Sequence, residues 1–191
     1  MKRKEQAEKR RWEILSAALD VFIRKGFAAA KIQDIAQSVG MSIGLLFHYF
    51  ESKEKLYEEL IRIGISGPQT VLSAIKAESL EFFRTAARDI IRYVETEPFV
   101  AKMFVLMGQA RCNDAAPESV KELLSKSDII TISVKKIRQG QKDGSIKEGD
   151  PLAVAIAFWG AMQGIAELAA LMPGILIPDS EWIVDIIRRH K

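Results

Sequence analysis

Hydrophobic residues recur every three or four positions through most of this chain, which is the period of an α-helix with one apolar face. Near the N-terminus such a stripe predicts a helix over residues 5–25 that ends at Gly26; it contains Trp12, Leu15, Leu19 and Phe22. A second stripe predicts a helix that ends at Gly40, where a left-handed backbone favours glycine; it contains Ile32, Ile35, Ala36 and Val39. Strand-like alternation is scarce, so the pattern predicts an all-α protein.

A sharp turn is predicted after Gly40. Ser42 can accept a hydrogen bond from a free backbone N–H, so a third helix should begin there. We expect this helix to turn Leu46, Tyr49 and Phe50 inward and to leave Ile43, Leu45, Phe47 and His48 pointing elsewhere. Ser52 can cap a further helix from Lys53 to about Gly64. Two short helices joined in this way are typical of a helix-turn-helix, whose second helix enters the DNA major groove.

Helical periodicity extends through the rest of the chain. The predicted helices cover residues 79–95, 98–107 and 118–139, and an apolar run follows over residues 151–177. The segment 64–68, Gly-Ile-Ser-Gly-Pro, predicts a bend or break before them. We therefore expect an N-terminal three-helix helix-turn-helix domain over residues 1–63, joined to a C-terminal helical domain over residues 64–191.

Residues 26–56, G-F-A-A-A-K-I-Q-D-I-A-Q-S-V-G-M-S-I-G-L-L-F-H-Y-F-E-S-K-E-K-L, resemble the N-terminal DNA-binding domain of TetR-type transcriptional regulators (the TetR/AcrR family). The matching positions are Gly26, Phe27, Ile35, Ala36, Gly40, Ser42, Gly44, Leu46, His48, Tyr49, Phe50, Ser52, Lys53, Glu54 and Leu56. The resemblance covers about residues 10–60, and the remainder is similar only in length and helical character. It implies an effector-binding and dimerisation role for the C-terminal domain, and a homodimer on a double-stranded DNA operator with two-fold symmetry.

Three departures from the family pattern change the expected DNA contacts. Ala30 stands where Thr or Ser usually caps a helix, and we hypothesise that the adjacent Lys31 contacts a phosphate; the alternative is a solvated lysine. Phe47 stands where Tyr is usual, so one phosphate hydrogen bond is absent. Ile43 and Leu45 are apolar, and such side chains can contact a thymine methyl but not a guanine edge.

Because of these departures, we expect the protein to recognise DNA mainly through phosphates, DNA shape and His48. The alternative for Leu45 is that its side chain packs inward. The predicted DNA-binding residues are Lys31, Ser42, Ile43, Gly44, Leu45, Phe47, His48, Tyr49 and Lys53. Residues 1–55 hold 11 Lys or Arg against 7 Asp or Glu, a balance of +4 in a chain whose net charge is +3. Six of these cations, Lys2, Arg3, Lys4, Lys9, Arg10 and Arg11, form either a solvated tail or an arm that binds DNA.

The apolar run over residues 151–177 has two interpretations. Gln163, Glu167 and the Pro173-Gly174 pair interrupt it, so we expect no membrane span. A stripe of small residues, Ala153, Ala157, Gly160 and Gly164, permits close backbone approach. We hypothesise that this stripe and the predicted helix over residues 118–139 build a four-helix homodimer interface.

The C-terminal domain also contains side chains suited to a small-molecule effector. The predicted effector-binding residues are Phe83, Tyr93, Met103, Met107, Trp159, Gln163 and Glu167. A buried carboxylate in an aromatic setting can oppose a cationic ligand. The alternatives are an ordinary apolar core and, for Glu167, a salt bridge or an exposed helix end.

Enzymatic chemistry is not predicted. The chain has two histidines and one cysteine, and no phosphate-binding glycine loop or metal-ligand spacing, so we expect no cofactor, no metal and a cytoplasmic location. The predicted function is a ligand-responsive dimeric DNA-binding transcriptional regulator, a repressor released from its operator by a small, mainly apolar effector. The alternative is an effector-independent helix-turn-helix nucleoid or division factor.

Overall fold

The computed structural model describes residues 2–126 and 129–190. Within that part of the chain the regular elements are helices, with one isolated antiparallel bridge between Ile146 and Arg188. The helices form two compact units, one of residues 2–65 with 105–126 and the other of residues 66–104 with 129–190. The division therefore falls inside two helices, α4 (Lys53–Ala74) and α6 (Pro98–Arg111). The prediction of an all-α fold is confirmed.

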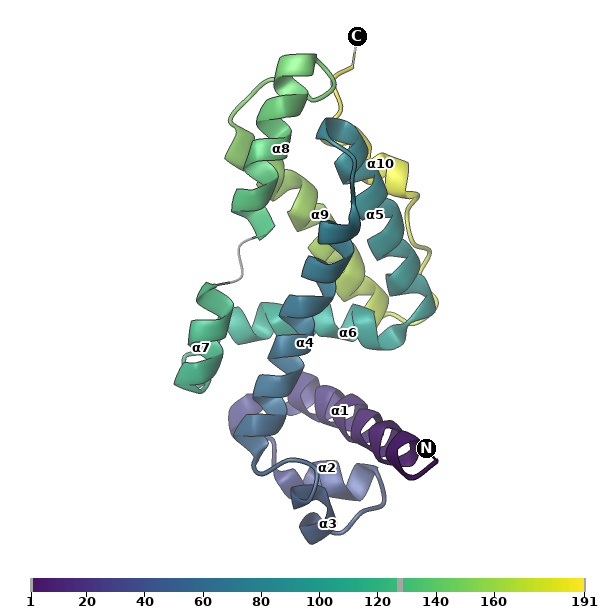
Figure 1. Cartoon of the computed structure of the whole chain (residues 1–191), viewed down its shortest axis with the longest axis vertical. Helices are drawn as coiled ribbons and strands as arrows, with labels where there is room; N and C mark the ends of the chain where they lie inside the picture. The colour runs from purple at the N-terminus through teal and green to yellow at the C-terminus, as the bar shows by residue number, and fades with distance from the viewer. Residues whose placement is uncertain (1, 127–128, 191) are drawn as a thin grey trace. The chain divides into compact units, whose positions relative to one another are not determined.

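The first unit contains the predicted helix-turn-helix. Its helices are α1 (Lys2–Ala29), α2 (Ile32–Ser38), α3 (Ile43–Phe47), the first part of α4, the last part of α6, and α7 (Glu118–Ser125). α2 contacts both α1 and α3, and α3 leads through a short turn into α4 (Figure 1). The largest fully buried side chains around them are Ile14, Leu15, Leu19, Phe22, Ile35, Leu46, Leu56, Tyr57, Leu60 and Ile61.

The first helix differs from the prediction in two respects. Gly26 has a positive φ of 71°, but it kinks α1 instead of ending it, and one more helical turn follows to Ala29. Trp12 was predicted to lie in the apolar stripe, and this is wrong, because 50% of the residue is exposed. The buried side of α1 instead combines the predicted Leu15, Leu19 and Phe22 with Ile14, Ala18 and Val21.

The predicted break over residues 64–68 is wrong as well. α4 runs without interruption from Lys53 to Ala74 with Pro68 inside it. Proline removes one backbone hydrogen bond, but its restricted φ is itself helical, so a helix formed on both sides can continue through it.

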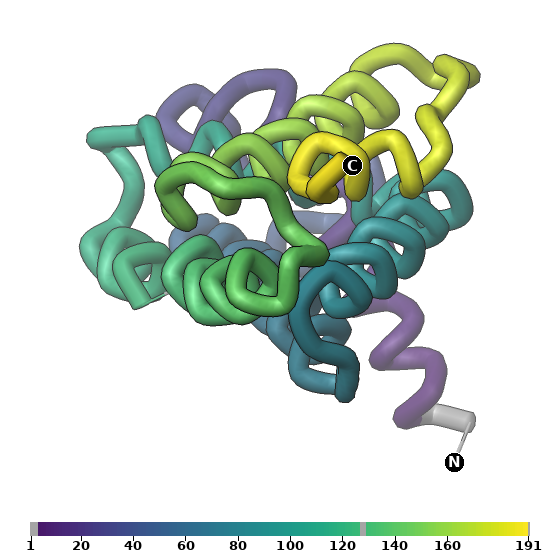
Figure 2. Tube along the Cα trace, turned by 90° about the horizontal axis from the view of Figure 1, so that it is seen from above, coloured from purple at the N-terminus to yellow at the C-terminus, as the bar shows by residue number. Residues whose placement is uncertain are grey.

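The second unit is built around α5 (Ser79–Thr96). This helix contacts α8 (Ile129–Asp143), α9 (Pro151–Leu171) and α10 (Ser180–Asp185), and Figure 2 shows α8, α9 and α10 beside it. Edge-to-face contacts join Phe83 to Phe158 and Phe158 to Trp159, each with ring centroids 5.0 Å apart. Asp150 caps α9 by accepting the backbone N–H of Ala153 at 2.9 Å.

The single helix predicted over residues 118–139 is wrong, since two helices cover this range. α7 ends at Ser125, and α8 begins at Ile129 in the other unit. Residues 127–128 of that prediction lie outside the described residues. α7 closes at its C-cap residue Lys126, whose backbone N–H donates to the carbonyls of Leu123 and Leu124.

Candidate functional site

The turn between α2 and α3 is defined by local hydrogen bonds. Gly40 has a φ of +62°, and the N–H of Met41 reaches back to the carbonyl of Ala36 at 2.9 Å, which closes the end of α2. The hydroxyl of Ser42 accepts the N–H of Leu45 at 3.2 Å and so caps α3. Both predictions, the glycine end and the serine cap, are confirmed. They set the direction in which α3 leaves the turn.

One side of α3 is buried and the other is open. Leu46 is fully buried, whereas Ile43, Leu45 and Phe47 are 39%, 47% and 43% exposed. The alternative in which Leu45 packs inward is therefore wrong. We call the exposed residues the α3 face: Ile43, Gly44, Leu45, Phe47 and His48.

Two inward residues follow α3 instead of lying within it. Phe50 is buried as predicted, while Tyr49 is only partly buried, in the turn that leads to α4. Ser52 accepts the N–H of Lys55 at 3.2 Å, which confirms that it caps α4.

The N-terminus of α2 is capped by a residue that the sequence interpretation missed. Ala30 is buried, and Lys31 occupies the cap position with an exposed side chain that has no acceptor atom. The backbone N–H of Lys31 instead donates to Oδ2 of Asp34 at 3.2 Å, and Lys25 Nζ lies 2.8 Å from the same oxygen. The hydrogen bond from Lys25, followed by that from Lys31, holds the pKa of Asp34 below its usual range.

Lys53, predicted to bind DNA, has partners inside the protein. Its Nζ donates to the carbonyls of Phe27 at 2.9 Å and Ala30 at 3.1 Å, and it lies 4.4 Å from the centre of the Phe27 ring. These bonds satisfy carbonyls at the end of α1. A DNA contact by Lys53 stays a prediction, and the geometry adds a structural role.

Arg10 and Arg11 are likewise tied into the first unit, so a tail or arm is the wrong description of these two residues. Arg10 donates to the carbonyl of Val39 at the end of α2, at 3.1 Å. Arg11 pairs with Glu59 of α4 at 2.7 Å, and its guanidinium lies 4.4 Å from the ring centre of Phe50. Lys4 and Lys9 remain exposed on the same helix.

A carboxylate on α4 joins that helix to α7. Glu58 is buried and accepts hydrogen bonds from Arg62 at 2.6 Å, from Lys55 at 3.2 Å and from Ser119 at 3.2 Å. The bond from Arg62 is the main cause that lowers the pKa of Glu58, and the bond from Lys55 adds to it. The helical spacing could have indicated the two cations, but nothing local in the sequence indicates Ser119.

The predicted effector-binding residues are not all brought together. Phe83 and Met103 are buried, but Tyr93 is 39% exposed beneath the guanidinium of Arg92. Tyr93 therefore does not face the core of α5, which is formed by Phe83 and its helical neighbours. Met107 belongs to the first unit, while the other six residues belong to the second.

The polar members of the predicted effector set bind one another and the neighbouring helices. Gln163 Nε2 donates to Oε1 of Glu167 at 2.6 Å and to the carbonyl of Phe104 at 2.9 Å. Trp159 Nε1 donates to the hydroxyl of Ser133 at 2.7 Å. The amide of Gln163 thus donates to one oxygen of Glu167, which reduces the cost of placing these polar groups on an apolar helix.

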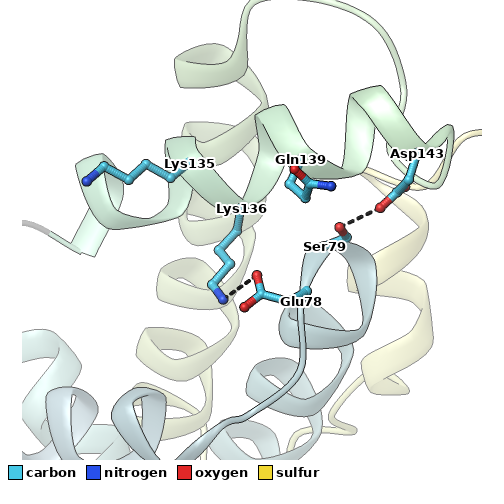
Figure 3. Close-up of a pocket in the computed structure, with 6 residues that line it drawn as sticks. All are labelled: Glu78, Ser79, Lys135, Lys136, Gln139 and Asp143. Carbon is cyan, nitrogen blue, oxygen red and sulfur yellow. Dashed lines mark hydrogen bonds and ion pairs between the residues drawn. The ribbon is translucent and has the colours of Figure 1, made fainter.

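A recess of about 540 Å³ in the second unit has a different lining. It lies between the start of α5 and α8 and is lined by Glu78, Ser79, Lys135, Lys136, Gln139 and Asp143 (Figure 3). An ion pair between Lys136 and Glu78 and a hydrogen bond from the Ser79 hydroxyl to Asp143 span the recess, each at 2.6 Å. None of its lining residues belongs to the predicted effector set. Among the residues that the structure describes, no group of three or more His, Cys, Asp or Glu is placed to hold a metal.

Comparison with known proteins agrees with the first unit's geometry. Residues 14–60 match the family described as bacterial regulatory proteins, tetR family. The transcriptional regulator RutR of Escherichia coli K12 is 28% identical over 172 residues, which are 88% of this chain and 79% of RutR.

Solved structures share the fold over nearly the whole chain. The ketosteroid regulator KstR2 of Mycobacterium tuberculosis superposes with a TM-score of 0.70 at 18% identity, covering 95% of this chain and 96% of KstR2. AibR, solved with isovaleryl coenzyme A and operator DNA, superposes with a TM-score of 0.68 at 20% identity, covering 92% of this chain and 94% of AibR. The family match over residues 14–60, the similarity to RutR and a capped α3 with an open face lead to one conclusion: this chain is a DNA-binding transcriptional regulator whose helix-turn-helix resembles those of the tetR family.

Proposed function

We propose that this regulator is a homodimeric repressor that leaves a two-fold symmetric operator when a small, mainly apolar effector binds its second unit. The observation that carries the proposal is the α3 face. It is an exposed, largely apolar helix surface held by a glycine turn and a serine cap. A rigid helix presented in this way can enter the major groove without a change in the fold.

The proposed DNA contacts are of two kinds: contacts to phosphates, which position the protein on the duplex, and contacts to base edges, which recognise the sequence. Lys31 is exposed at the N-terminus of α2 and is suited to a phosphate, as is the cap region around Ser42. The α3 face meets the base edges, and Tyr49 and Lys53 follow it in the chain. Because Arg10 and Arg11 are engaged with carbonyls and carboxylates, they support the helices more than they add free charge.

The exposed apolar side of α9 supports a homodimer. Leu152, Ile156, Leu168 and Leu171 are each about half exposed or more, and only 28% of the most apolar stretch of this helix is buried within the single chain. By length and composition the helix could also cross a membrane, but regulators of this type bind DNA, and we propose a cytoplasmic dimer. The small residues Ala153, Ala157 and Gly160 lie on the exposed side. A second α9 would cover this surface.

The second unit supplies the effector site in this proposal. Phe83 and Met103 are apolar and buried, and Gln163 and Glu167 form a hydrogen-bonded polar pair on α9. AibR was solved with both an acyl coenzyme A and DNA, which supports ligand control in this fold. An effector that binds better to the conformation unsuited to DNA lowers operator affinity through linkage.

Selection of bound fragments from random duplex DNA tests the proposal. An inverted repeat with half-sites about one helical turn apart is the expected result. Fragments without a shared sequence would overturn it in favour of a nucleoid factor.

Lipophilic cations then test the effector site through thermal stabilisation of the parent and of Glu167→Gln. The expected result is a smaller shift in the variant. Equal shifts would remove Glu167 from the effector site.

A further inference from the structure

The five residues of α3 are Ile43, Gly44, Leu45, Leu46 and Phe47. None of their side chains can donate or accept a hydrogen bond. In a major groove, direct recognition of guanine, cytosine or adenine depends on hydrogen bonds to donors and acceptors on their base edges. The helix that is to read the bases therefore lacks the groups with which such edges are read.

The arrangement of the α3 face is set by the buried Leu46. Successive residues of a helix are about 100° apart, so Gly44 lies nearly opposite Leu46 and at the middle of the open side. Ile43 and Phe47, four positions apart, flank Gly44 on one side, and Leu45 flanks it on the other. A Cβ atom at Gly44 would meet nothing within 4 Å, so the protein's own packing does not require glycine there. The α3 face is thus a shallow trough between two apolar edges.

Three polar side chains lie close to the apolar residues of α3 in the chain or on the neighbouring helix. The oxygen of Ser42 already accepts the N–H of Leu45. His48 is the exposed C-cap residue of α3, and it is the one member of the α3 face whose side chain can form a hydrogen bond with a base edge. Lys31 is at the N-terminus of α2, where the proposed contact is to a phosphate.

Thymine is the standard base that offers an apolar group in the major groove, its C5-methyl. We propose that the α3 face selects its operator by burying thymine methyl groups against Ile43 and Phe47 on one edge and against Leu45 on the other. Polar base edges at the same positions are disfavoured, because an apolar side chain would remove their water without replacing the hydrogen bonds. This inference rests on the proposed operator binding by α3.

The first experiment uses the unaltered protein and the duplex selected from random DNA. Each thymine of one half-site is replaced in turn by deoxyuridine, which removes the methyl and keeps every hydrogen bond. Affinity is measured by fluorescence anisotropy at one fixed salt concentration. At two or more positions we expect a loss of about fourfold, which is the value of one buried methyl group.

The second experiment assigns each methyl to a side chain. Leu45→Ala should abolish the affinity difference between thymine and uracil at the base pair that Leu45 contacts and retain it elsewhere. Phe47→Ala should abolish the difference at the base pair that Phe47 contacts and retain it at the one that Leu45 contacts. Because both residues are more than a third exposed, these variants should remain folded. Lys31→Ala is the matched control: it should weaken binding to every duplex by the same factor and leave each thymine-to-uracil ratio unchanged.

The outcomes separate the inference from the proposed function. Intact binding with no thymine-to-uracil difference at any position would overturn methyl recognition and leave the DNA-binding regulator standing. Variants that weaken all duplexes equally would overturn the assignment of Leu45 and Phe47. Failure to select any duplex would instead overturn the proposed function.

Discussion

At the scale of single residues, three basic side chains around the helix-turn-helix form bonds within the protein. Lys53, Arg10 and Arg11 donate to backbone carbonyls at the C-terminal ends of α1, α2 and just after α3. A positive charge is favourable at a helix C-terminus because the carbonyls there are unpaired and partly negative. These residues hold the helices in position, whereas the exposed Lys31 is the residue proposed to contact a phosphate.

Lys53→Met and Lys31→Met should therefore behave differently. Lys53→Met is expected to lower the free energy of unfolding by about 1–3 kcal/mol, because two carbonyls lose a charged donor. Lys31→Met should change stability by less than about 0.5 kcal/mol and reduce the salt slope of operator binding by about 0.9. Urea unfolding and salt titrations measure the two effects. Equal stability of both variants would contradict the structural role of Lys53.

Gly44→Ala should stabilise the fold while weakening DNA binding. The new methyl meets no protein atom within 4 Å, and alanine is favoured over glycine in a helix by about 0.5–1 kcal/mol. The same methyl projects from the middle of the α3 face, where the proposed groove contact brings the backbone close to DNA. Gly67→Ala on α4 is the control, since its methyl is equally unobstructed and lies far along the chain from α3. If Gly44→Ala bound the operator like the parent, α3 would not be the reading helix.

The residues that could be predicted from the sequence are those with local partners. Gly40, Ser42 and Ser52 were identified because a turn or cap depends on neighbours within a few positions. The bonds of Lys53 to Phe27 and of Arg11 to Glu59 join positions 26 and 48 residues apart, so they depend on the tertiary fold. Tyr93 shows the same limit, because its aromatic character did not reveal which side of α5 it occupies.

At the scale of elements, the number of helices depended on features that periodicity does not encode. Apolar spacing located most helical segments but joined α7 to α8, and the glycine and proline residues of segment 64–68 gave α4 a predicted end at Gly64. Pro68 disfavours a helix by about 3 kcal/mol, which packing on both sides of it can offset. The prediction treated a local preference as decisive where tertiary contacts prevailed.

The link between α4 and α7 should be sensitive to acid. The pKa of Glu58 is held below its usual 4.5, so the folded state favours the carboxylate. The ionised Glu58 therefore contributes fully to the free energy of unfolding at pH values above 4.5. This contribution is lost as the pH falls through the folded-state pKa. Glu58→Gln should be less stable than the parent at pH 7, and the difference between them should shrink as the pH falls below 4.5.

Urea unfolding of both proteins between pH 7 and pH 3 measures this effect, and the other titrating carboxylates cancel in the difference. Glu122→Gln, on the exposed side of α7, is the matched control and should follow the parent at every pH. A constant difference between parent and Glu58→Gln across that range would contradict an ionised link.

At the scale of the whole molecule, the proposed dimer makes DNA affinity depend on a surface remote from DNA in the sequence. Ile156 is 51% exposed on α9, in the middle of the proposed interface. Ile156→Glu should give a folded monomer, since a carboxylate buried between two apolar helices costs far more than the isoleucine contact contributes. The two α3 faces would then no longer be linked, and operator affinity should fall by about 10²–10⁴-fold.

Sedimentation equilibrium and fluorescence anisotropy on the same samples test this coupling. Tyr93→Glu is the matched control, because it introduces the same charge at an exposed aromatic on α5 beside Arg92 and should remain a dimer with parental affinity. A dimeric Ile156→Glu would move the interface away from α9. A monomer that kept parental operator affinity would show that each α3 binds DNA independently. The effector could not then act by changing the distance between the two α3 helices of a dimer.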